Sequence, residues 1–253
     1  MNTERAFAVV TGGGTSGHVL PALAIADALV AGGHERASIH YVGTRRGVET
    51  TLLPPTGYPH TFLDVVGLQR SVSARNLAFL PKLFGAVRAA KALLQELQPK
   101  VVVNVGGYGS FPATWAARRL KVPYVVVSYD RRPGQVSKLM AKRASAVAVA
   151  FEGSVLPHAE LTGAPVRGDM IALDRAAGRA AAREALGLPA DRFVVAVMCG
   201  SLGAAVINDA VNGAVEHFAD RRDLAVYHVV GDRFLKDAAP SRDGADGILY
   251  RVI

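Results

Sequence analysis

The stretch Val9-Val10-Thr11-Gly12-Gly13-Gly14-Thr15-Ser16-Gly17-His18 decides the fold class of this chain. A short apolar strand runs into a glycine-rich turn, and a helix-forming segment, Pro21 to Ala31, follows. In α/β domains such a turn directs the first N–H groups of the helix toward an anionic or sugar ligand. Thr15, Ser16 and His18 add two hydroxyls and a titratable nitrogen. A glycine-rich turn also occurs where a chain merely reverses, so binding site and plain turn both remain open at this point.

The composition indicates a globular protein of one large or two modest domains. The chain has 253 residues, of which 50% are apolar and 20% are charged. This balance is sufficient for a substantial core and argues against disorder. The net charge of +8 suggests an acidic partner, such as nucleic acid, a nucleotide phosphate or an anionic membrane. Nucleic acid is disfavoured, because the basic residues are scattered and only 7% of residues are aromatic.

The number of cysteines and the hydropathy of the chain indicate the cellular compartment in which we expect the protein. Cys199 is the single cysteine, which excludes an internal disulfide framework and a cysteine metal cluster, and we expect it to be a small packed residue. A reducing compartment, the cytoplasm, follows from this. Residues 1–5 are polar and lack the apolar segment of a signal peptide, and no apolar run reaches the roughly 18 to 20 residues of a transmembrane helix. We expect any membrane contact to be peripheral.

Apolar β-branched runs alternate with alanine- and leucine-rich helical patterns, which is typical of parallel strands joined by helices. The predicted strands are Phe7 to Val10, Ser38 to Val42, Val101 to Val105, Tyr124 to Val127 and Ala146 to Ala150. The predicted helices are Pro21 to Ala31, Leu83 to Leu97, Pro112 to Arg119 and Gln135 to Arg143. The sequence therefore predicts a doubly wound domain with its binding edge at the carboxyl ends of the strands.

A second unit is predicted to start after the turn at residues 161–167. We place the boundary there, which gives domains 1–163 and 164–253. The second domain contains a solvated helix from Asp174 to Leu186 and three strand candidates, Phe193 to Met198, Leu224 to Val230 and Gly247 to Ile253. Its 90 residues fall short of the roughly 100 to 150 residues of a common domain. We expect an incomplete second Rossmann-like unit, as in a truncated chain.

Five glycine-containing motifs occur in order along the chain: Gly12 to His18, Gly43 to Glu49, Gly106 to Pro112, Gly163 to Arg167 and Gly200 to Ala204. Together they resemble the MurG family, the bacterial N-acetylglucosaminyltransferases that make the lipid II precursor of peptidoglycan. The resemblance implies the GT-B fold, with two Rossmann-like, doubly wound parallel-sheet domains. It also implies that the N-terminal domain takes a lipid-linked acceptor and the C-terminal domain takes UDP-N-acetylglucosamine.

The implied reaction is an inverting transfer of N-acetylglucosamine from UDP to the 4-hydroxyl of the N-acetylmuramoyl group of undecaprenyl-linked lipid I. The family works at the cytoplasmic face of the cell membrane as a peripheral protein in cell wall synthesis, on which cell shape and division depend. No metal or other cofactor is expected. The displacement needs a base for the hydroxyl proton, and His18 is the candidate, since its ordinary pKa is near neutral. The alternative is that His18 only braces the turn.

The resemblance also assigns residues to the donor. Thr15, Ser16 and Gly17 match family positions that touch it, and Arg167 matches a position that grips the diphosphate or the uridine, although a loop arginine is often a solvated surface group. Ser201, at the second strand-to-helix turn, could bind the diphosphate or serve as a helix cap.

On the acceptor side the family match points to Gly106, Gly107, Tyr108 and Ser110, although Tyr108 could simply pack. Glu49 resembles a family glutamate. It could equally stabilise a helix dipole, and we assign it no catalytic role.

The segment from Asn76 to Phe84 is crowded with apolar side chains and flanked by basic residues. In the family the corresponding region docks on the membrane, and an apolar patch with a basic rim suits an anionic leaflet. An amphipathic helix facing the core is the alternative. The predicted membrane patch consists of Leu77, Phe79, Leu80, Leu83, Phe84, Lys82 and Arg88.

The sequence departs from the family at residues 127–134. The family pattern His-Glu-x-Asn-x-x-Pro-Gly is replaced by Val-Ser-Tyr-Asp-Arg-Arg-Pro-Gly, so Asp130 stands where an asparagine contacts the donor sugar. An ionised carboxylate only accepts hydrogen bonds, whereas an amide also donates them. The later family motifs have no counterpart before Ile253. Two alternatives therefore stay open: a diverged UDP-sugar transferase with another lipid acceptor, and a non-catalytic, truncated membrane-binding partner.

Overall fold

The computed structural model describes residues 5–67, 79–200 and 203–253, and the chain divides into two compact units, Met1–Ile171 and Ala172–Ile253. The domain boundary expected from the sequence, between residues 163 and 164, lies eight residues before this division. The segment between the two positions contains only the short helix α6 (Gly168–Ile171), whose residues are all exposed.

The N-terminal unit is built on a seven-stranded sheet in the order β3-β2-β1-β4-β5-β6-β7, and every pair of neighbours is parallel. The strands are β1 (Ala8–Thr11), β2 (Ile39–Thr44), β3 (His60–Leu63), β4 (Val101–Asn104), β5 (Tyr124–Ser128), β6 (Ala146–Val149) and β7 (Ala159–Leu161). The helices are α1 (Ser16–Ala31), α2 (Glu49–Leu52), α3 (Phe79–Leu97), α4 (Phe111–Leu120) and α5 (Gln135–Ala141), followed by α6, with 3-10 turns η1 (Arg36–Ser38), η2 (Pro54–Thr56) and η4 (Tyr108–Ser110).

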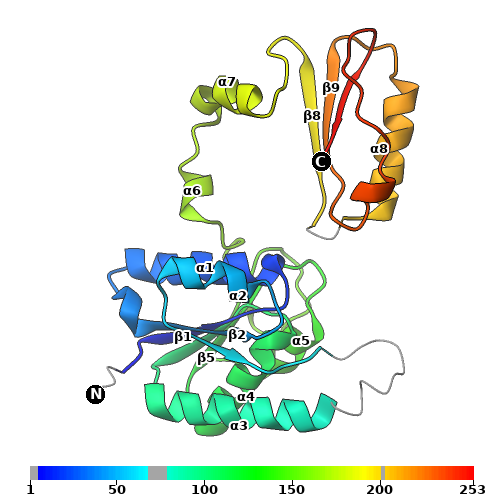
Figure 1. Cartoon of the computed structure of the whole chain (residues 1–253). Helices are drawn as coiled ribbons and strands as arrows, with labels where there is room; N and C mark the ends of the chain where they lie inside the picture. Colours follow the sequence, from blue (N-terminus) through cyan, green and yellow to red (C-terminus); the bar gives the residue numbers. More distant parts are fainter. Residues whose placement is uncertain (1–4, 68–78, 201–202) are drawn as a thin grey trace. The chain divides into compact units, whose positions relative to one another are not determined.

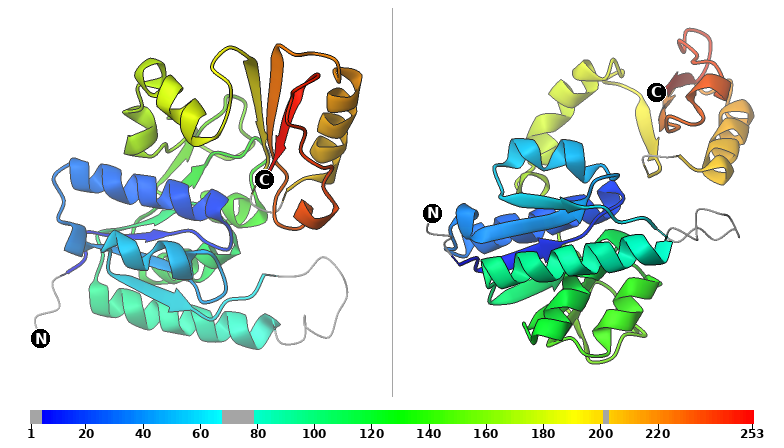
Figure 2. Two further views of the ribbon diagram at one scale, coloured as in Figure 1. Left: turned by 45° about the horizontal axis from the view of Figure 1, so that its top comes forward. Right: turned by 60° about the horizontal axis from the view of Figure 1, so that its bottom comes forward.

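Successive side chains of a strand point to opposite faces of the sheet, so each face has its own apolar core. Val9 faces the side covered by α3, α4 and α5, whereas Val10 faces the side covered by α1. Figures 1 and 2 show these helices on opposite sides of the sheet. Both strand residues are fully buried, which explains why the central strands read as continuous apolar runs in the sequence. The predicted doubly wound domain is confirmed.

The sequence prediction for the N-terminal unit lacked two of the described strands, β3 and β7, and two single-turn helices, α2 and α6. β3 and β7 lie at the two edges of the sheet, and they are only four and three residues long. A short edge strand is paired on one side only and mixes polar with apolar residues, as His60-Thr61-Phe62-Leu63 does, so no apolar run announces it. The helix α2 is a single turn, too short for a periodic pattern.

Two helices begin earlier than predicted. α1 begins at Ser16 rather than at Pro21, and α3 extends from Phe79 rather than from Leu83. The start at Pro21 was wrong because proline was taken as the first helical residue, whereas it lies inside the helix. In α3 the proline at position 81 falls in the first described turn, so it does not interrupt the rest of the helix.

The C-terminal unit contains a three-stranded parallel sheet in the order β10-β9-β8. Val215 packs against Val226 and Tyr250 on one face, and Leu188 packs against Ala225 on the other. Phe193 lies on β8, an edge strand of this sheet, and is 70% exposed. The elements are α7 (Arg175–Ala185), β8 (Phe193–Met198), α8 (Ala205–His217), β9 (Leu224–Val229), η5 (Leu235–Asp237) and β10 (Leu249–Val252). This smaller unit confirms the second parallel-sheet unit that the sequence predicts.

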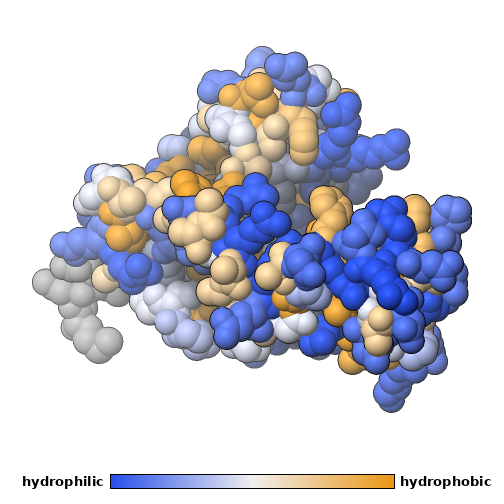
Figure 3. Space-filling model, turned by 90° about the horizontal axis from the view of Figure 1, so that it is seen from above, coloured by the Kyte–Doolittle hydropathy of each residue, from blue (hydrophilic) through white to orange (hydrophobic). Residues whose placement is uncertain are grey.

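The surface seen in Figure 3 is largely hydrophilic, with apolar residues interspersed among the polar ones. Within the described ranges, no helix combines the length and the apolar character that crossing a bilayer requires.

Candidate functional site

A cavity of about 540 Å³ lies at the carboxyl ends of the strands in the N-terminal unit. The first turn of α1, which follows β1, contributes to it together with the segments after β3, β4 and β5. It therefore lies beside the point where the strand order reverses between β1 and β4. Doubly wound sheets bind ligands at this position. The described lining residues are His18, Val65, Val66, Gly67, Phe79, Leu83, Gly107, Tyr108, Phe111, Asp130, Gly134, Gln135, Val136 and Ser137.

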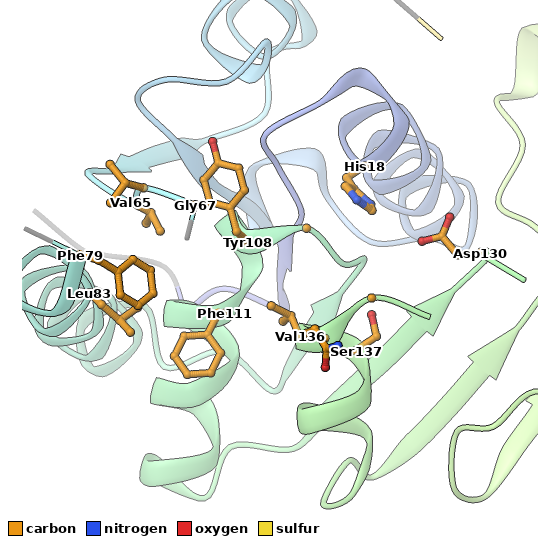
Figure 4. A pocket seen from close by; sticks show the side chains of 14 residues that line it. His18, Val65, Gly67, Phe79, Leu83, Tyr108, Phe111, Asp130, Val136 and Ser137 are labelled. Atoms are coloured by element: carbon orange, nitrogen blue, oxygen red, sulfur yellow. The ribbon is translucent and has the colours of Figure 1, made fainter. Parts of the chain in front are cut away.

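The cavity has a polar side and an apolar side. His18 and Asp130 lie together on one side, whereas Phe79, Leu83 and Phe111 lie on the other (Figure 4). The polar side offers a titratable nitrogen and a carboxylate, and the apolar side offers a surface for hydrocarbon. Such a cavity suits a ligand with a polar head and an apolar tail.

The glycine-rich turn is held in place by Glu49, whose side chain is completely buried. Its carboxylate accepts hydrogen bonds from the Thr44 N–H at 2.7 Å, the Thr44 hydroxyl at 2.8 Å and the Gly14 N–H at 3.2 Å. A Cβ at Gly13 or at Gly47 would overlap this carboxylate. The first two glycine motifs therefore fit together around one side chain, and Glu49 has a structural task that the sequence did not reveal.

His18 lies in the first turn of α1, and its ring is partly buried. Two glycines after β4 make room for it. A Cβ at Gly106 would lie 3.3 Å from the ring atoms Cε1 and Nδ1, and one at Gly107 would lie 2.9 Å from Cδ2 and would also overlap the Gly13 carbonyl. Both glycines have positive φ, 87° and 77°, which L side chains rarely adopt.

The turn after β4 is braced from inside by Asn104. Its Oδ1 accepts from the Gly106 N–H at 2.8 Å, and its Nδ2 donates to the Thr114 hydroxyl at 2.7 Å. The Ser110 hydroxyl donates to the Gly107 carbonyl at 2.9 Å, and Ser110 is fully buried. Asn104 and Ser110 therefore shape the loop that carries Gly107 and Tyr108 into the cavity.

The sequence-predicted site residues fall into three groups. The cavity is lined by His18, Gly107, Tyr108 and Asp130 together with Phe79 and Leu83 of the predicted membrane patch. Ser201 and Leu77 lie outside the described residues. Not among the described lining residues are Thr15, Ser16, Gly17, Gly106, Ser110, Arg167, Leu80, Lys82, Phe84 and Arg88.

Several residues of the last group have clear local settings. Ser16 and Gly17 belong to the first turn of α1, where the backbone N–H groups have no preceding helical carbonyl to bond. Arg167 pairs with Asp169, its Nε 3.3 Å from the carboxylate, and its side chain is 44% exposed. The roles assigned to these residues stay predictions.

The described residues of the predicted membrane patch lie on α3, but they do not all point in the same direction. Phe79 and Leu83 face the cavity, whereas Leu80 and Phe84 are 58% and 73% exposed. Lys82 pairs with Asp64 at 3.3 Å. Two large apolar side chains with this exposure, one turn apart, lie on one outward face of the helix.

Sequence reasoning missed Tyr129, which follows β5. Its hydroxyl lies 2.8 Å from Nδ1 of His18, 2.6 Å from the Gly17 carbonyl and 3.3 Å from the Val105 carbonyl. Burial raises the pKa of this phenol, and the neighbouring charge of Asp130 raises it further. The available signal was its place at the carboxyl end of a central strand, one residue before Asp130.

The fold and the site define a class of protein: an α/β chain of two parallel-sheet units with a ligand cavity at the glycine-rich edge of the first. The family model described as Glycosyltransferase family 28 N-terminal domain matches residues 8–149. A relative from Rhodococcus jostii is 40% identical over 93% of this chain, and one from Paenarthrobacter aurescens is 40% identical over 100% of it. Both are named UDP-N-acetylglucosamine--N-acetylmuramyl-(pentapeptide) pyrophosphoryl-undecaprenol N-acetylglucosamine transferase.

The chain belongs to glycosyltransferase family 28 and, within it, to the MurG family. It spans 64% and 67% of the length of the two relatives. The crystal structure of MurG from Acinetobacter baumannii resembles it with a TM-score of 0.64 at 22% identity, covering 98% of this chain and 67% of that one. This likeness supports the GT-B type of fold predicted from the sequence. Among the described residues, no cluster of three His, Cys, Asp or Glu side chains is arranged to hold a metal ion.

Proposed function

We propose that the protein transfers N-acetylglucosamine from UDP-N-acetylglucosamine to the 4-hydroxyl of lipid I, with inversion at the anomeric carbon, and so forms lipid II. The names of the relatives at 40% identity support the donor and the acceptor. The observation that carries the proposal is the position of His18, at a cavity with one polar and one apolar side. That cavity suits the sugar and the lipid portion of one acceptor.

In the proposed reaction the acceptor oxygen attacks the anomeric carbon while the bond from that carbon to the UDP oxygen breaks. His18 takes the hydroxyl proton and later releases it to water, and UDP leaves with the bonding electrons. The N–H groups of Ser16 and Gly17, at the positive end of the α1 dipole, would hydrogen-bond donor oxygens, with the Thr15 hydroxyl beside them. Arg167, Ser201 and Asp130 complete the proposed donor contacts, and Gly106, Gly107, Tyr108 and Ser110 form the acceptor side.

We also propose that the protein docks on the cytoplasmic face of the cell membrane, where the lipid-linked acceptor resides. Leu80 and Phe84 are exposed on α3, and the net charge of +8 would attract an anionic leaflet. The lipid tail of the acceptor would then reach the apolar side of the cavity next to the same helix. Cell shape and division would depend on this activity through the cell wall.

A transfer assay tests the proposed function. The protein is incubated with UDP-N-acetylglucosamine and lipid I in detergent, and lipid II and free UDP are measured by mass spectrometry. Equal amounts of lipid II and UDP are expected. Parallel reactions with UDP-glucose and UDP-N-acetylgalactosamine, and with an undecaprenyl diphosphate sugar other than lipid I, examine the specificity.

A second candidate is a UDP-sugar transferase with another sugar or lipid acceptor. The replacement of the family pattern by Ser128-Tyr129-Asp130 favours it, because the carboxylate at Asp130 lines the cavity where a family asparagine is expected. Product formation in the parallel reactions alone would establish this candidate. Vesicle binding without any turnover or nucleotide binding would leave a non-catalytic membrane partner.

A further inference from the structure

The hydroxyl of Tyr129 joins two segments that are far apart in the sequence. Tyr129 follows the central strand β5, and its ring packs partly buried against the apolar core on the α1 face. The hydroxyl reaches the first turn of α1, where Gly17 and His18 lie, 112 and 111 residues away in sequence. The two shorter contacts, to the Gly17 carbonyl and to Nδ1 of His18, measure 2.6 and 2.8 Å.

The Gly17 carbonyl needs a donor from outside the helix. In a regular α-helix its partner would be the N–H of residue 21, but that residue is Pro21, which has none. The Tyr129 hydroxyl lies at the distance of a strong hydrogen bond from this carbonyl and 3.3 Å from the weaker alternative, the Val105 carbonyl. Both carbonyls only accept, so the single phenol proton points to Gly17.

This arrangement decides the state of the histidine. Because the phenol proton is engaged with Gly17, the Tyr129 oxygen can only accept in its contact with His18. The proton of a neutral His18 must then lie on Nδ1. Burial and the charge of Asp130 raise the pKa of Tyr129, so the phenol keeps its proton near neutral pH.

We propose that Tyr129 is a positioning residue that holds neutral His18 with its proton on Nδ1, so that Nε2 carries the free lone pair. The proposal rests on the proposed function for its catalytic meaning: Nε2 is the atom that accepts the proton of the acceptor hydroxyl. Gly106 and Gly107 support the arrangement, because the ring lies against their backbone and a side chain at either position would displace it. Tyr129 itself transfers no proton in the reaction.

The arrangement can be tested by nitrogen NMR on the full chain labelled with 15N-histidine, at a pH at which the histidines are neutral. His18→Gln identifies the His18 signals among the seven histidines. The wild-type protein should show a protonated Nδ1 and an unprotonated Nε2. Tyr129→Phe keeps the ring and removes the hydroxyl, so the His18 signals should shift toward a mixture of the two neutral forms.

A matched control is Tyr58→Phe, which also removes a hydroxyl hydrogen bond, the 2.6 Å contact with Asp27, but from a residue that does not line the cavity. It should leave the His18 signals unchanged. In the transfer assay Tyr129→Phe should lower kcat roughly tenfold, the effect of losing one hydrogen bond, while KM for the donor changes less than about twofold. Tyr58→Phe should keep the wild-type kcat.

A wild-type His18 protonated on Nε2, or identical His18 signals in wild type and Tyr129→Phe, would overturn the proposal. If the wild-type protein transfers no sugar from any donor, the proposed function fails, and the NMR comparison still decides whether Tyr129 sets the protonated nitrogen. A shifted tautomer together with wild-type kcat in Tyr129→Phe would overturn the catalytic part.

Discussion

Glu49 is buried beneath the glycine-rich turn, and its carboxylate is bonded by the N–H groups of Gly14 and Thr44 and by the Thr44 hydroxyl. A carboxylate that accepts several hydrogen bonds from the backbone tolerates burial, because these bonds replace its water shell. The glycines around it are required for a steric reason: a Cβ at Gly13 or at Gly47 would overlap the carboxylate. Glu49 thus ties the turn after β1 to the end of β2.

Removing this carboxylate should destabilise the N-terminal unit. Glu49→Ala leaves the buried Thr44 N–H and the partly buried Gly14 N–H without acceptors and is expected to lower the free energy of unfolding by about 2 to 4 kcal/mol. Glu49→Gln keeps one acceptor oxygen and should cost about half as much. Urea unfolding followed by the fluorescence of Trp115, the single tryptophan, measures this unit, because Trp115 lies in α4. Equal stability of Glu49→Ala and the surface control Glu96→Ala would contradict the assigned role.

His18 should matter for turnover and not for stability. His18→Ala is expected to lower kcat by roughly a hundred- to ten-thousandfold, the usual contribution of a general base, with little change in KM for UDP-N-acetylglucosamine. Steady-state kinetics at saturating acceptor measures both quantities. His217→Ala, which removes an exposed histidine of α8, is the matched control and should retain wild-type turnover. Wild-type kcat in His18→Ala would remove this residue from the mechanism.

Among the elements, strand β2 carries a partly buried histidine, His40, that faces the neighbouring edge strand β3. The Nε2 atom of His40 on β2 lies 2.9 Å from the Thr61 hydroxyl on β3. Burial, with a smaller contribution from the nearby His60, lowers the pKa of His40 from 6.5 to about 4. The folded state therefore favours the neutral imidazole, and the unfolded chain binds a proton first as the pH falls.

The N-terminal unit should consequently lose stability between pH 6.5 and pH 4. A depressed histidine pKa contributes stability that is complete above the unfolded value and is lost as the pH falls toward the folded value. The loss from His40 alone is on the order of 3 kcal/mol. Urea unfolding followed by Trp115 fluorescence across this range measures it. His40→Gln should show a shallower pH dependence, and parallel curves for the variant and the wild type would refute the assignment.

At the scale of the whole molecule, the net charge and the exposed apolar side chains determine how the protein would bind a membrane surface. The net charge of +8 acts over a Debye length, about 10 Å at 0.1 M salt, whereas Leu80 and Phe84 act only on contact. Long-range attraction to an anionic surface and short-range apolar insertion are thus separable by salt. Neither contribution alone gives firm attachment.

Binding to vesicles of phosphatidylglycerol should weaken when salt rises from about 0.1 M to about 0.5 M, because the attraction is screened. The double variant Leu80→Ser/Phe84→Ser should bind at least about tenfold more weakly at either salt, because it loses two apolar side chains. Vesicle sedimentation measures both effects. Val155→Ser/Leu161→Ser removes side chains of similar exposure, 73% and 56%, and should bind as the wild type does. Equal loss in both double variants would assign the binding to general hydrophobicity.

The sequence by itself determined the parallel α/β architecture, the glycine-rich turn and the place of His18 at its end. These features are local: buried central strands are continuous apolar runs, and the chain direction at the turn follows from a few adjacent residues. The sequence also carried the family, through motifs in a fixed order. Edge strands such as β3 were not predicted, because a strand that is paired on one side only does not form a continuous apolar run.

Only the tertiary structure decided what surrounds those residues. Tyr129 meets His18 across 111 positions and Glu49 meets Gly14 across 35, and both contacts depend on β1 lying between β2 and β4. Leu83 lines the cavity, whereas Phe84 next to it is exposed, because the packing of α3 selects which face turns inward. Spacing along one chain fixes what can share a helix face, but the register and packing of separate elements fix which side chains meet.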